Sequence, residues 1–248
     1  MTRAAATAYR AARHAHGRAA LAEKVADGAD GTPTMRVDAL VEDAVAEAAA
    51  RNEVNLLSEE AGCLDHGSAT TLVVDPVDGS ANAAAGVPLC SFGGVVLADG
   101  RPTEAVTCWL ETGRCWWTRV GQPSAYRTSG RVELAGASVD LMRPKANTVA
   151  AWQRVADRAG RVTVLGSTCV EAALVAEGSI DAFADPGSDT HRIVDLAAAL
   201  VTVPAAGGVV LDVHGRPLEF DFDLTRRWSG VVAATRSLGE QLVASILR

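Results

Sequence analysis

The sequence predicts an α+β protein in which two β-sheets have helices between and outside them. Helical periodicity dominates most of the first 52 residues, three strand-like segments joined by hairpin turns follow between residues 91 and 120, and helices alternate with strands from residue 148 onward. A helix or a sheet must bury its apolar face against another layer, so this order of elements is typical of a layered protein.

The first part of the chain combines helices with two short strands. Met1–Lys24 can place Tyr9 and several alanines on one helical stripe, and Met35–Asn52 repeats apolar residues at helical spacing. The apolar segment Val54–Ser58 predicts a strand. Thr70–Val74 is a β-branched run without alternation, which predicts a strand that is covered on both faces.

Three further strand-like segments predict an antiparallel meander. The dipeptides Asp99-Gly100 and Thr112-Gly113 separate them, and both favour hairpin turns. The three predicted strands are Ser91–Leu97, Thr103–Leu110 and Arg114–Arg119.

The second part alternates between helices and strands, and no internal repeat or linker is evident. A junction near residues 135–148 is the candidate boundary between the two parts. The predicted helices are Thr148–Arg158, Ser167–Glu177, Thr190–Ala205 and Ser237–Leu247, and the predicted strands are Val162–Leu165, Ser179–Phe183, Val209–Val213 and Val231–Ala234.

Composition narrows the class of partner. The chain of 248 residues has a net charge of -7 and no run of Lys or Arg that could follow a nucleic-acid backbone, so we expect no nucleic-acid polymer as a partner. No stretch is apolar and long enough to cross a bilayer. The cysteines form no CxxC pair, which favours reduced, mostly buried thiols in a cytoplasmic protein; they are Cys63, Cys90, Cys108, Cys115 and Cys169.

Two aspartates three positions apart are the first candidate site. Asp75 and Asp78 follow a predicted buried strand, and a tight turn through Pro76 and Gly79 would direct both carboxylates to one point. Carboxylates held that close repel each other unless a cation lies between them, and Mg2+ prefers such oxygen ligands. The backbone N–H groups of Gly79 and Ser80 are suited to a phosphate. An ordinary turn explains the motif equally well when it is taken alone.

The spacing separates this motif from another class of phosphatase. Enzymes with an aspartyl-phosphate nucleophile typically have a single residue between the two aspartates, and here two residues lie between them. Further acids follow a predicted strand end, at Glu59 and Glu60, or begin an apolar helix, at Asp195. Each has an alternative explanation as a solvated acid or as a carboxylate at the positive end of a helix dipole.

Taken in order, these pieces resemble the inositol monophosphatase and fructose-1,6-bisphosphatase superfamily over nearly the whole chain. The first motif and the segment before Asp195 are most similar to the archaeal-type enzymes that accept both substrates. The matching elements are Gly28-Ala-Asp-Gly-Thr-Pro-Thr34 with Asp38, Ser58-Glu-Glu-Ala-Gly62, Asp75-Pro-Val-Asp-Gly-Ser80, Gly166-Ser-Thr168 through Gly178 and Asp181, and Asp195-Leu-Ala-Ala198 with Ala206-Gly-Gly208.

The resemblance implies two or three Mg2+ ions per site. Glu59, Asp75 and the Val77 carbonyl would hold one ion, and Asp75, Asp78 and Asp195 would hold a second, with a third and weaker ion near Glu59. In two-metal phosphoryl transfer, one ion lowers the pKa of the attacking water and the other stabilises the leaving alkoxide.

The resemblance also implies the catalytic and substrate-binding residues. Asp38 with the Ser80 hydroxyl, or Glu59, would orient or deprotonate the attacking water, and no covalent enzyme intermediate is expected. Asp185 would face the alcohol part of the substrate. The complete set of expected phosphate and substrate contacts is Gly79, Ser80, Ser167, Asp185 and Arg192.

The length of one loop leaves the identity of the substrate undecided. Pro186–Arg192 is longer than in inositol monophosphatases and lies where the pocket would touch the substrate. His191 and Arg192 either contact the substrate or cap the start of the following helix. Arg143 and Lys145 either bind a second phosphate or lie in a solvated loop.

The implied fold is the layered α/β/α/β/α sandwich of the sugar phosphatases. Residues 1–140 would form an N-terminal α+β half with most metal ligands, and residues 141–248 a C-terminal α/β half with the last metal Asp and the substrate loop. Relatives are commonly dimers, so a homodimer is expected. The expected reaction is hydrolysis of a small phosphorylated metabolite, with inositol-1-phosphate and fructose-1,6-bisphosphate as leading candidates. Histidinol phosphate, a nucleotide 3'-phosphate, a specialised metabolite, or a regulatory role without turnover are the alternatives.

Overall fold

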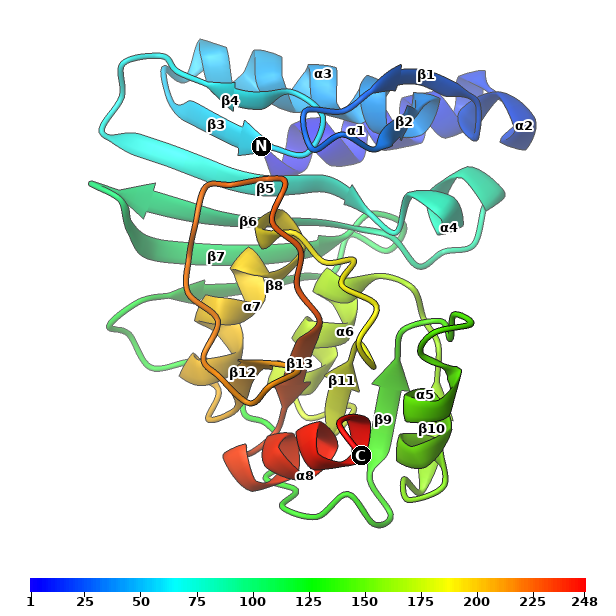
Figure 1. The fold of residues 1–248 in the computed structure, drawn as a ribbon. Coiled ribbons are helices and arrows are strands. Elements are labelled where there is room, and N and C mark those ends of the chain that lie inside the picture. The colour runs from blue at the N-terminus through cyan, green and yellow to red at the C-terminus, as the bar shows by residue number, and fades with distance from the viewer.

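The computed structural model describes residues 1–248 and has five layers, which alternate between helices and sheets (Figure 1). The first layer contains α1 (Thr2–Ala15) and α3 (Arg36–Arg51), the third contains α6 (Thr168–Ala176) and α7 (Ile193–Ala205), and the fifth contains α5 (Val149–Ala156) and α8 (Arg236–Ile246). The predicted α/β/α/β/α sandwich is confirmed.

The second layer is a six-stranded sheet with the strand order β4-β3-β5-β6-β7-β8. The strand β3 is parallel to β5, and every other neighbouring pair is antiparallel. Its strands are β3 (Asn55–Ser58), β4 (Gly62–Leu64), β5 (Thr70–Asp78), β6 (Ser91–Ala98), β7 (Arg101–Trp109) and β8 (Cys115–Arg119).

The fourth layer is a five-stranded sheet with the strand order β10-β9-β11-β13-β12. The strands β10, β9 and β11 are parallel, whereas β13 is antiparallel to both of its neighbours. Its strands are β9 (Ser138–Leu141), β10 (Arg161–Thr163), β11 (Ala182–Ala184), β12 (Val209–Asp212) and β13 (Gly230–Ala233).

Most predicted elements are confirmed, with ends that shift by a few residues. The predicted helix Met1–Lys24 is wrong as one element, because α1 ends at Ala15, a short α2 (Arg18–Leu21) follows, and β1 (Lys24–Asp27) pairs with β2 (Pro33–Met35). The predicted end of the strand Thr70–Val74 is also wrong. The strand β5 continues to Asp78, and α4 (Ser80–Ala85) begins after Gly79.

The middle helix α7 is apolar on all sides because it lies between the two sheets. Val194 and Ala198 belong to an apolar cluster with Val73 and Val95 of the first sheet. The opposite side of the helix, including Leu196, packs with residues of the second sheet. A helix buried on both sides has no polar face. A carboxylate on it, such as Asp195, therefore needs a specific partner.

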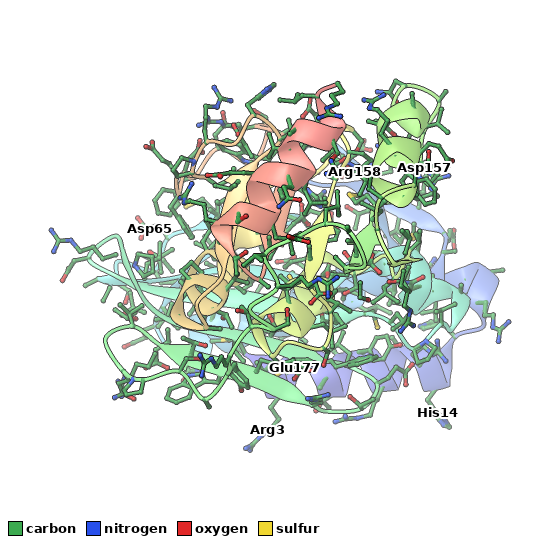
Figure 2. The ribbon with its side chains drawn as sticks, turned by 90° about the horizontal axis from the view of Figure 1, so that it is seen from below. Arg3, His14, Asp65, Asp157, Arg158 and Glu177 are labelled. Atoms are coloured by element: carbon green, nitrogen blue, oxygen red, sulfur yellow. A yellow bond between two sulfur atoms is a disulfide. The ribbon has the colours of Figure 1, made fainter.

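Several charged side chains lie at the periphery. Arg3, His14, Asp65 and Asp157 are exposed and project from the ribbon (Figure 2). No helix combines the length and the apolar character that a membrane span requires.

The expectation that all cysteines are reduced is wrong for one pair. Cys108 of β7 and Cys115 of β8 are direct partners in the antiparallel register and form a disulfide. The hairpin between the two strands places the side chains opposite each other. The other three cysteines are free thiols, namely Cys63, Cys90 and Cys169.

The division of the chain near residue 140 stays a prediction. The strand β9 spans this boundary and belongs to the second sheet. The helix α7 comes from the C-terminal half and shares an apolar cluster with the first sheet. The two predicted halves therefore share a common core.

Candidate active site

Two acidic residues follow neighbouring parallel strands. In the parallel pair β3 and β5, Ser58 is opposite Val74, so the next residues, Glu59 and Asp75, emerge at the same edge of the sheet. Asp75 is 4% exposed, and its Oδ1 accepts a hydrogen bond of 3.0 Å from the Val77 N–H. Strand pairing therefore brings together two of the residues predicted to bind a metal.

A bulge directs Asp78 to another part of the structure. Asp78 lies three positions after Asp75, whereas their partners on β6, Gly93 and Ser91, are only two positions apart, so β5 carries an extra residue there. Pro76 lies in this bulge and has no N–H to donate. The bulge turns the Asp78 carboxylate toward the start of α6.

The Asp78 carboxylate is fixed by donors from the start of α6. The N–H groups of Thr168 and Cys169 donate to its Oδ1 and Oδ2 at 3.2 and 2.8 Å, and the Ser167 hydroxyl donates to Oδ2 at 2.5 Å. Ser167, predicted as a substrate contact, thus supports Asp78. Its contact with a substrate stays a prediction.

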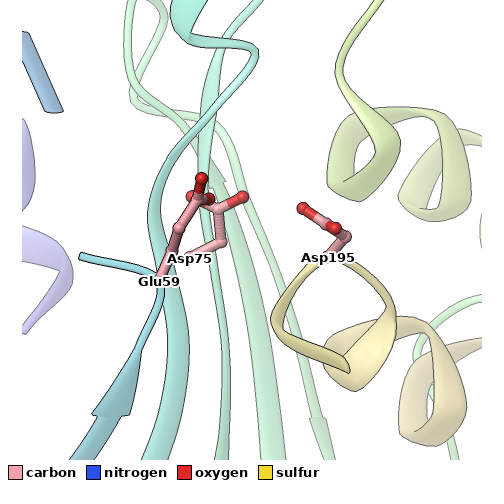
Figure 3. A group of neighbouring side chains, drawn as sticks. All are labelled: Glu59, Asp75 and Asp195. Carbon is pink, nitrogen blue, oxygen red and sulfur yellow. The ribbon is translucent and has the colours of Figure 1, made fainter. Parts of the chain in front are cut away.

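Asp195 approaches the first two acids from the middle helix (Figure 3). It lies in the first turn of α7, and its Oδ2 accepts a hydrogen bond of 2.5 Å from the Arg192 N–H. Ligand atoms of Glu59, Asp75 and Asp195 all lie within 4.8 Å of one another. Residues from three elements and two sequence-distant parts of the chain therefore form one acidic cluster.

Arg192 offsets part of the negative charge of this cluster. Its Nη1 lies 2.8 Å from Asp30 Oδ2 and also donates to Glu59 Oε1, and its Nε lies 3.2 Å from Asp195 Oδ2. Burial and the neighbouring Asp78 and Glu59 raise the pKa of Asp75 well above its usual range. Although burial opposes it, the Arg192 charge lowers the pKa of Asp195.

The donor set of the cluster fits a hard divalent cation. All three groups are carboxylates, and oxygen-only ligands are those that Mg2+ and similar ions prefer. The Arg192 guanidinium already pairs with two of these carboxylates, Glu59 and Asp195, so the cluster attracts positive charge. Asp78 is not among the mutually close ligand atoms. Its role as a metal ligand, like that of the Val77 carbonyl, stays a prediction.

A small cavity adjoins the cluster on one side. We call it the acidic cavity; it has a volume of 10 Å³, which is about the space of one water molecule. Burial raises the pKa of Asp38 to about 7, and its Oδ1 has no hydrogen-bond partner. The lining residues are Asp38, Glu42, Glu59, Glu60, Asp75, Pro76, Val77 and Ser80. The structure therefore places Asp38, Glu59 and Ser80, the predicted catalytic residues, around one cavity.

The glycine before α4 is required by its surroundings. Gly79 has a φ of 87°, and a Cβ atom there would lie 2.8 Å from the Leu89 carbonyl oxygen. The Ser80 hydroxyl donates to the Val77 carbonyl at 3.0 Å. The predicted phosphate contacts through the backbone of Gly79 and Ser80 stay predictions.

A larger opening also borders the site and shares no lining residue with the acidic cavity. We call it the large cleft; it has a volume of 530 Å³, within the range of pockets that bind small molecules. Its walls include Asp78, Asp195, Arg143, Thr168, His191 and Arg192. Lys145, the other cation that we considered for a second phosphate, is not among its lining residues.

Asp185 is buried behind this cleft. It is 0% exposed, and its carboxylate accepts hydrogen bonds of 2.8 Å from the N–H and the hydroxyl of Ser188. It does not line the large cleft. Its contact with the alcohol part of a substrate stays a prediction.

Two residues of the site had no assigned role from the sequence. Asp30 binds Arg192 and also Arg227, which lies 3.1 Å from its Oδ2. Glu42 lines the acidic cavity and has one oxygen without a partner. Asp30 lies in the first matching motif, which could have identified it. Glu42 lies four residues after Asp38 on α3, so its position one helical turn away was the available signal.

Comparison with known proteins gives consistent results. The family model described as "Inositol monophosphatase family" matches residues 1–248. A fructose-1,6-bisphosphatase/inositol-1-monophosphatase of Thermococcus kodakarensis is 31% identical over 221 residues, which are 87% of this chain and 84% of the relative. The enzyme of the same name from Methanothermobacter thermautotrophicus is 32% identical over 241 residues, covering 88% of this chain and 85% of the relative.

Solved structures share the fold. The crystal structure of an inositol monophosphatase-fructose 1,6-bisphosphatase has a TM-score of 0.85 at 24% identity and covers 99% of this chain and 96% of the other. The Thermotoga maritima IMPase has a TM-score of 0.80 at 17% identity, with 99% and 93% of the two chains covered. At these identities, the likeness shows the fold alone.

Proposed function

We propose that this chain, which belongs to the inositol monophosphatase family, is a Mg2+-dependent phosphatase. Its proposed reaction is the hydrolysis of the phosphate monoester of a sugar or a cyclitol. The observation that carries the proposal is the acidic cluster, in which Glu59, Asp75 and Asp195 have ligand atoms within 4.8 Å of one another. Buried carboxylates at this distance repel one another unless a proton or a cation offsets their charge, and a cation here would also neutralise the phosphate during hydrolysis of a monoester.

The residues that would hold the metal come from three segments of the fold: the end of β3, the end of β5 and the start of α7. Glu59, Asp75 and the Val77 carbonyl would hold one ion, and Asp75, Asp78 and Asp195 a second, with two or three ions per site. When bound, the ions supply charge neutralisation for the phosphate and acidify the attacking water.

The protein's own groups would position the water and the phosphate. Asp38, which lines the acidic cavity and has an Oδ1 without a partner, would accept a proton from the attacking water with Ser80 beside it. Glu59 lines the same cavity and is the alternative acceptor. The backbone N–H groups of Gly79 and Ser80 would hold the phosphate. Arg192 is close enough to the cluster to contact the same phosphate from the large cleft.

The large cleft supports a small polar alcohol as the remainder of the substrate. Its volume of 530 Å³ suits a monosaccharide or an inositol, and most of the residues that line it are polar or charged. The relatives from Thermococcus and Methanothermobacter carry names for activity on fructose-1,6-bisphosphate and inositol-1-phosphate, which we propose as the leading substrates. Histidinol phosphate and a nucleotide 3'-phosphate remain the alternatives. A cytoplasmic homodimer is part of the proposal.

Phosphate release by the purified protein tests the proposal. With Mg2+, we expect turnover of at least one compound in a panel of sugar, cyclitol, amino-alcohol and nucleotide monoesters, and loss of that turnover when EDTA is added. Asp75→Asn should lower kcat by at least about 100-fold because it removes a charge shared by both ions. The matched control is Asp65→Asn, an exposed residue that should keep full activity. A folded protein that releases no phosphate from any compound would instead support a binding role.

A further inference from the structure

A threonine hydroxyl in the wall of the large cleft has a fixed orientation. Thr168 is the first residue of α6, is 7% exposed and lines the large cleft beside Asp78 and Asp195. Its N–H donates to Asp78 Oδ1, so the backbone of this residue is anchored next to the acidic cluster. Its hydroxyl oxygen lies 3.2 Å from Nε2 of His191.

The surroundings of His191 determine which of its nitrogens carries the proton. The ring is 2% exposed, and the Gly230 N–H donates to its Nδ1 at 3.2 Å. A nitrogen that accepts a hydrogen bond carries no proton, so the proton of the neutral ring is on Nε2. The nearest carboxylate oxygen, Asp185 Oδ2, is 3.9 Å from Nδ1, which is too long for a hydrogen bond.

The direction of the second hydrogen bond follows from this tautomer. Because Nε2 carries the proton, it donates to Thr168 Oγ1, and the hydroxyl oxygen acts as the acceptor. The Thr168 hydroxyl then keeps its own proton to donate, and no acceptor within the protein takes it. A buried donor that borders a ligand cleft is satisfied by a ligand or by water.

We propose that Thr168 donates a hydrogen bond to an oxygen of the alcohol part of the substrate, and that His191 is a positioning residue that fixes the direction of this donor. The inference rests on the proposed phosphatase function and deepens it. Thr168 lies on the wall of the large cleft, whereas the groups proposed to activate the water line the acidic cavity, which shares no lining residue with that cleft. The contact therefore falls on the leaving-alcohol side.

The proposed donor needs an acceptor on the substrate. A hydroxyl or ether oxygen of a polyol can accept this hydrogen bond. The inference thus assigns to the large cleft a substrate whose alcohol part carries an oxygen acceptor, and a substrate without one leaves the Thr168 donor unpaired.

The test compares one substrate that has hydroxyl groups with one that has none. For the holoenzyme with Mg2+, kcat/KM is measured on inositol-1-phosphate and on p-nitrophenyl phosphate. Thr168→Val keeps the shape of the side chain and removes the donor, so the ratio of the two values should fall roughly tenfold, mostly through KM, as expected for a lost hydrogen bond in a buried site. Thr168→Ser retains the donor and should keep the ratio.

The control is a buried threonine that is far from the cleft. Thr202 lies on α7 with a hydroxyl that has no partner, so Thr202→Val removes the same group without changing the ratio. For His191, the Met variant should lower the ratio and the Gln variant, which keeps a donor, should restore most of it. In the Thr168→Val background, His191→Met should have no further effect on the ratio, because His191 acts through Thr168.

Two results would overturn the inference. An unchanged ratio in a folded Thr168→Val variant would show that the hydroxyl does not contact the substrate, and independent effects of His191→Met and Thr168→Val would remove His191 from its positioning role. Failure of the proposed function is distinguishable, since the unmodified protein would then release phosphate from neither compound.

Discussion

The guanidinium of Arg192 lies 2.8 Å from the carboxylate of Asp30, although 162 residues separate them in the chain. This ion pair joins the turn between β1 and β2 to the start of α7, and it aligns Arg192 with Glu59 and Asp195. The Arg192 side chain is 16% exposed, so its charge is largely removed from water. One arginine therefore holds together acidic residues from three distant segments.

Replacing Arg192 by Met should destabilise the protein when no divalent ion is present. The change leaves Asp30, Glu59 and Asp195 without their common partner, and breaking a buried ion pair typically costs about 3–5 kcal/mol of unfolding free energy. Urea unfolding in EDTA measures the loss. Added Mg2+ should recover part of it, because the ion supplies the missing charge.

The control for this change is Arg216→Met. Arg216 pairs with Asp212 at 2.6 Å, but its side chain is 70% exposed, and exposed ion pairs contribute about 0–1 kcal/mol. If the two variants unfold at the same urea concentration, the stability of the protein does not depend on Arg192 to offset the negative charge of the cluster.

The sequence predicted the elements whose pattern is strong. The helix α3 and the strands β6 and β7 have clear periodicity and turn signals, so their ends were correct within a few residues. The ribbon of β1 and β2 was missed because β1 is exposed along its whole length and carries no apolar pattern. The last part of β5 was missed because Pro76 suggests a turn, whereas here it lies in a bulge.

The site was only partly accessible to sequence reasoning. Family motifs supplied the acids, and the parallel pairing of β3 and β5 explains why Glu59 and Asp75 meet. No local pattern shows that Arg192 reaches Asp30 or that His191 reaches Thr168, since both contacts depend on how the start of α7 packs against segments distant in the sequence. The Cys108–Cys115 disulfide, by contrast, could have been inferred from the register of the predicted hairpin.

A glycine in β6 provides a test of how closely α6 packs on the first sheet. A Cβ atom at Gly93 would lie 2.3 Å from Cys169 Sγ, a distance that the packing cannot accommodate without movement. Gly93→Ala should therefore lower the unfolding free energy by about 1–3 kcal/mol, the usual cost of overpacking. Urea unfolding followed by circular dichroism measures this change.

Two further variants separate overpacking from other causes. Cys169→Ala removes the sulfur, so the combination with Gly93→Ala should recover part of the loss, which is a coupling between neighbouring sites. Gly17 has no atom within 4 Å of its added Cβ, and Gly17→Ala should change stability much less. Equal losses for Gly93→Ala with and without Cys169→Ala would refute the close approach.

Asp78→Asn should abolish most turnover and also weaken the fold. The carboxylate accepts hydrogen bonds at both oxygens, from Cys169 and Ser167 on Oδ2 and from Thr168 on Oδ1. An asparagine must present its NH2 group to one of these donors, and such a mismatch costs about 1–3 kcal/mol. The loss of a metal-binding charge should lower kcat by at least about 100-fold.

The measurements for Asp78→Asn are phosphate release and thermal unfolding, with Asp65→Asn as the control. Near-normal turnover would exclude Asp78 as a metal ligand, whereas lost turnover with unchanged stability would show that the asparagine side chain is accommodated at the start of α6.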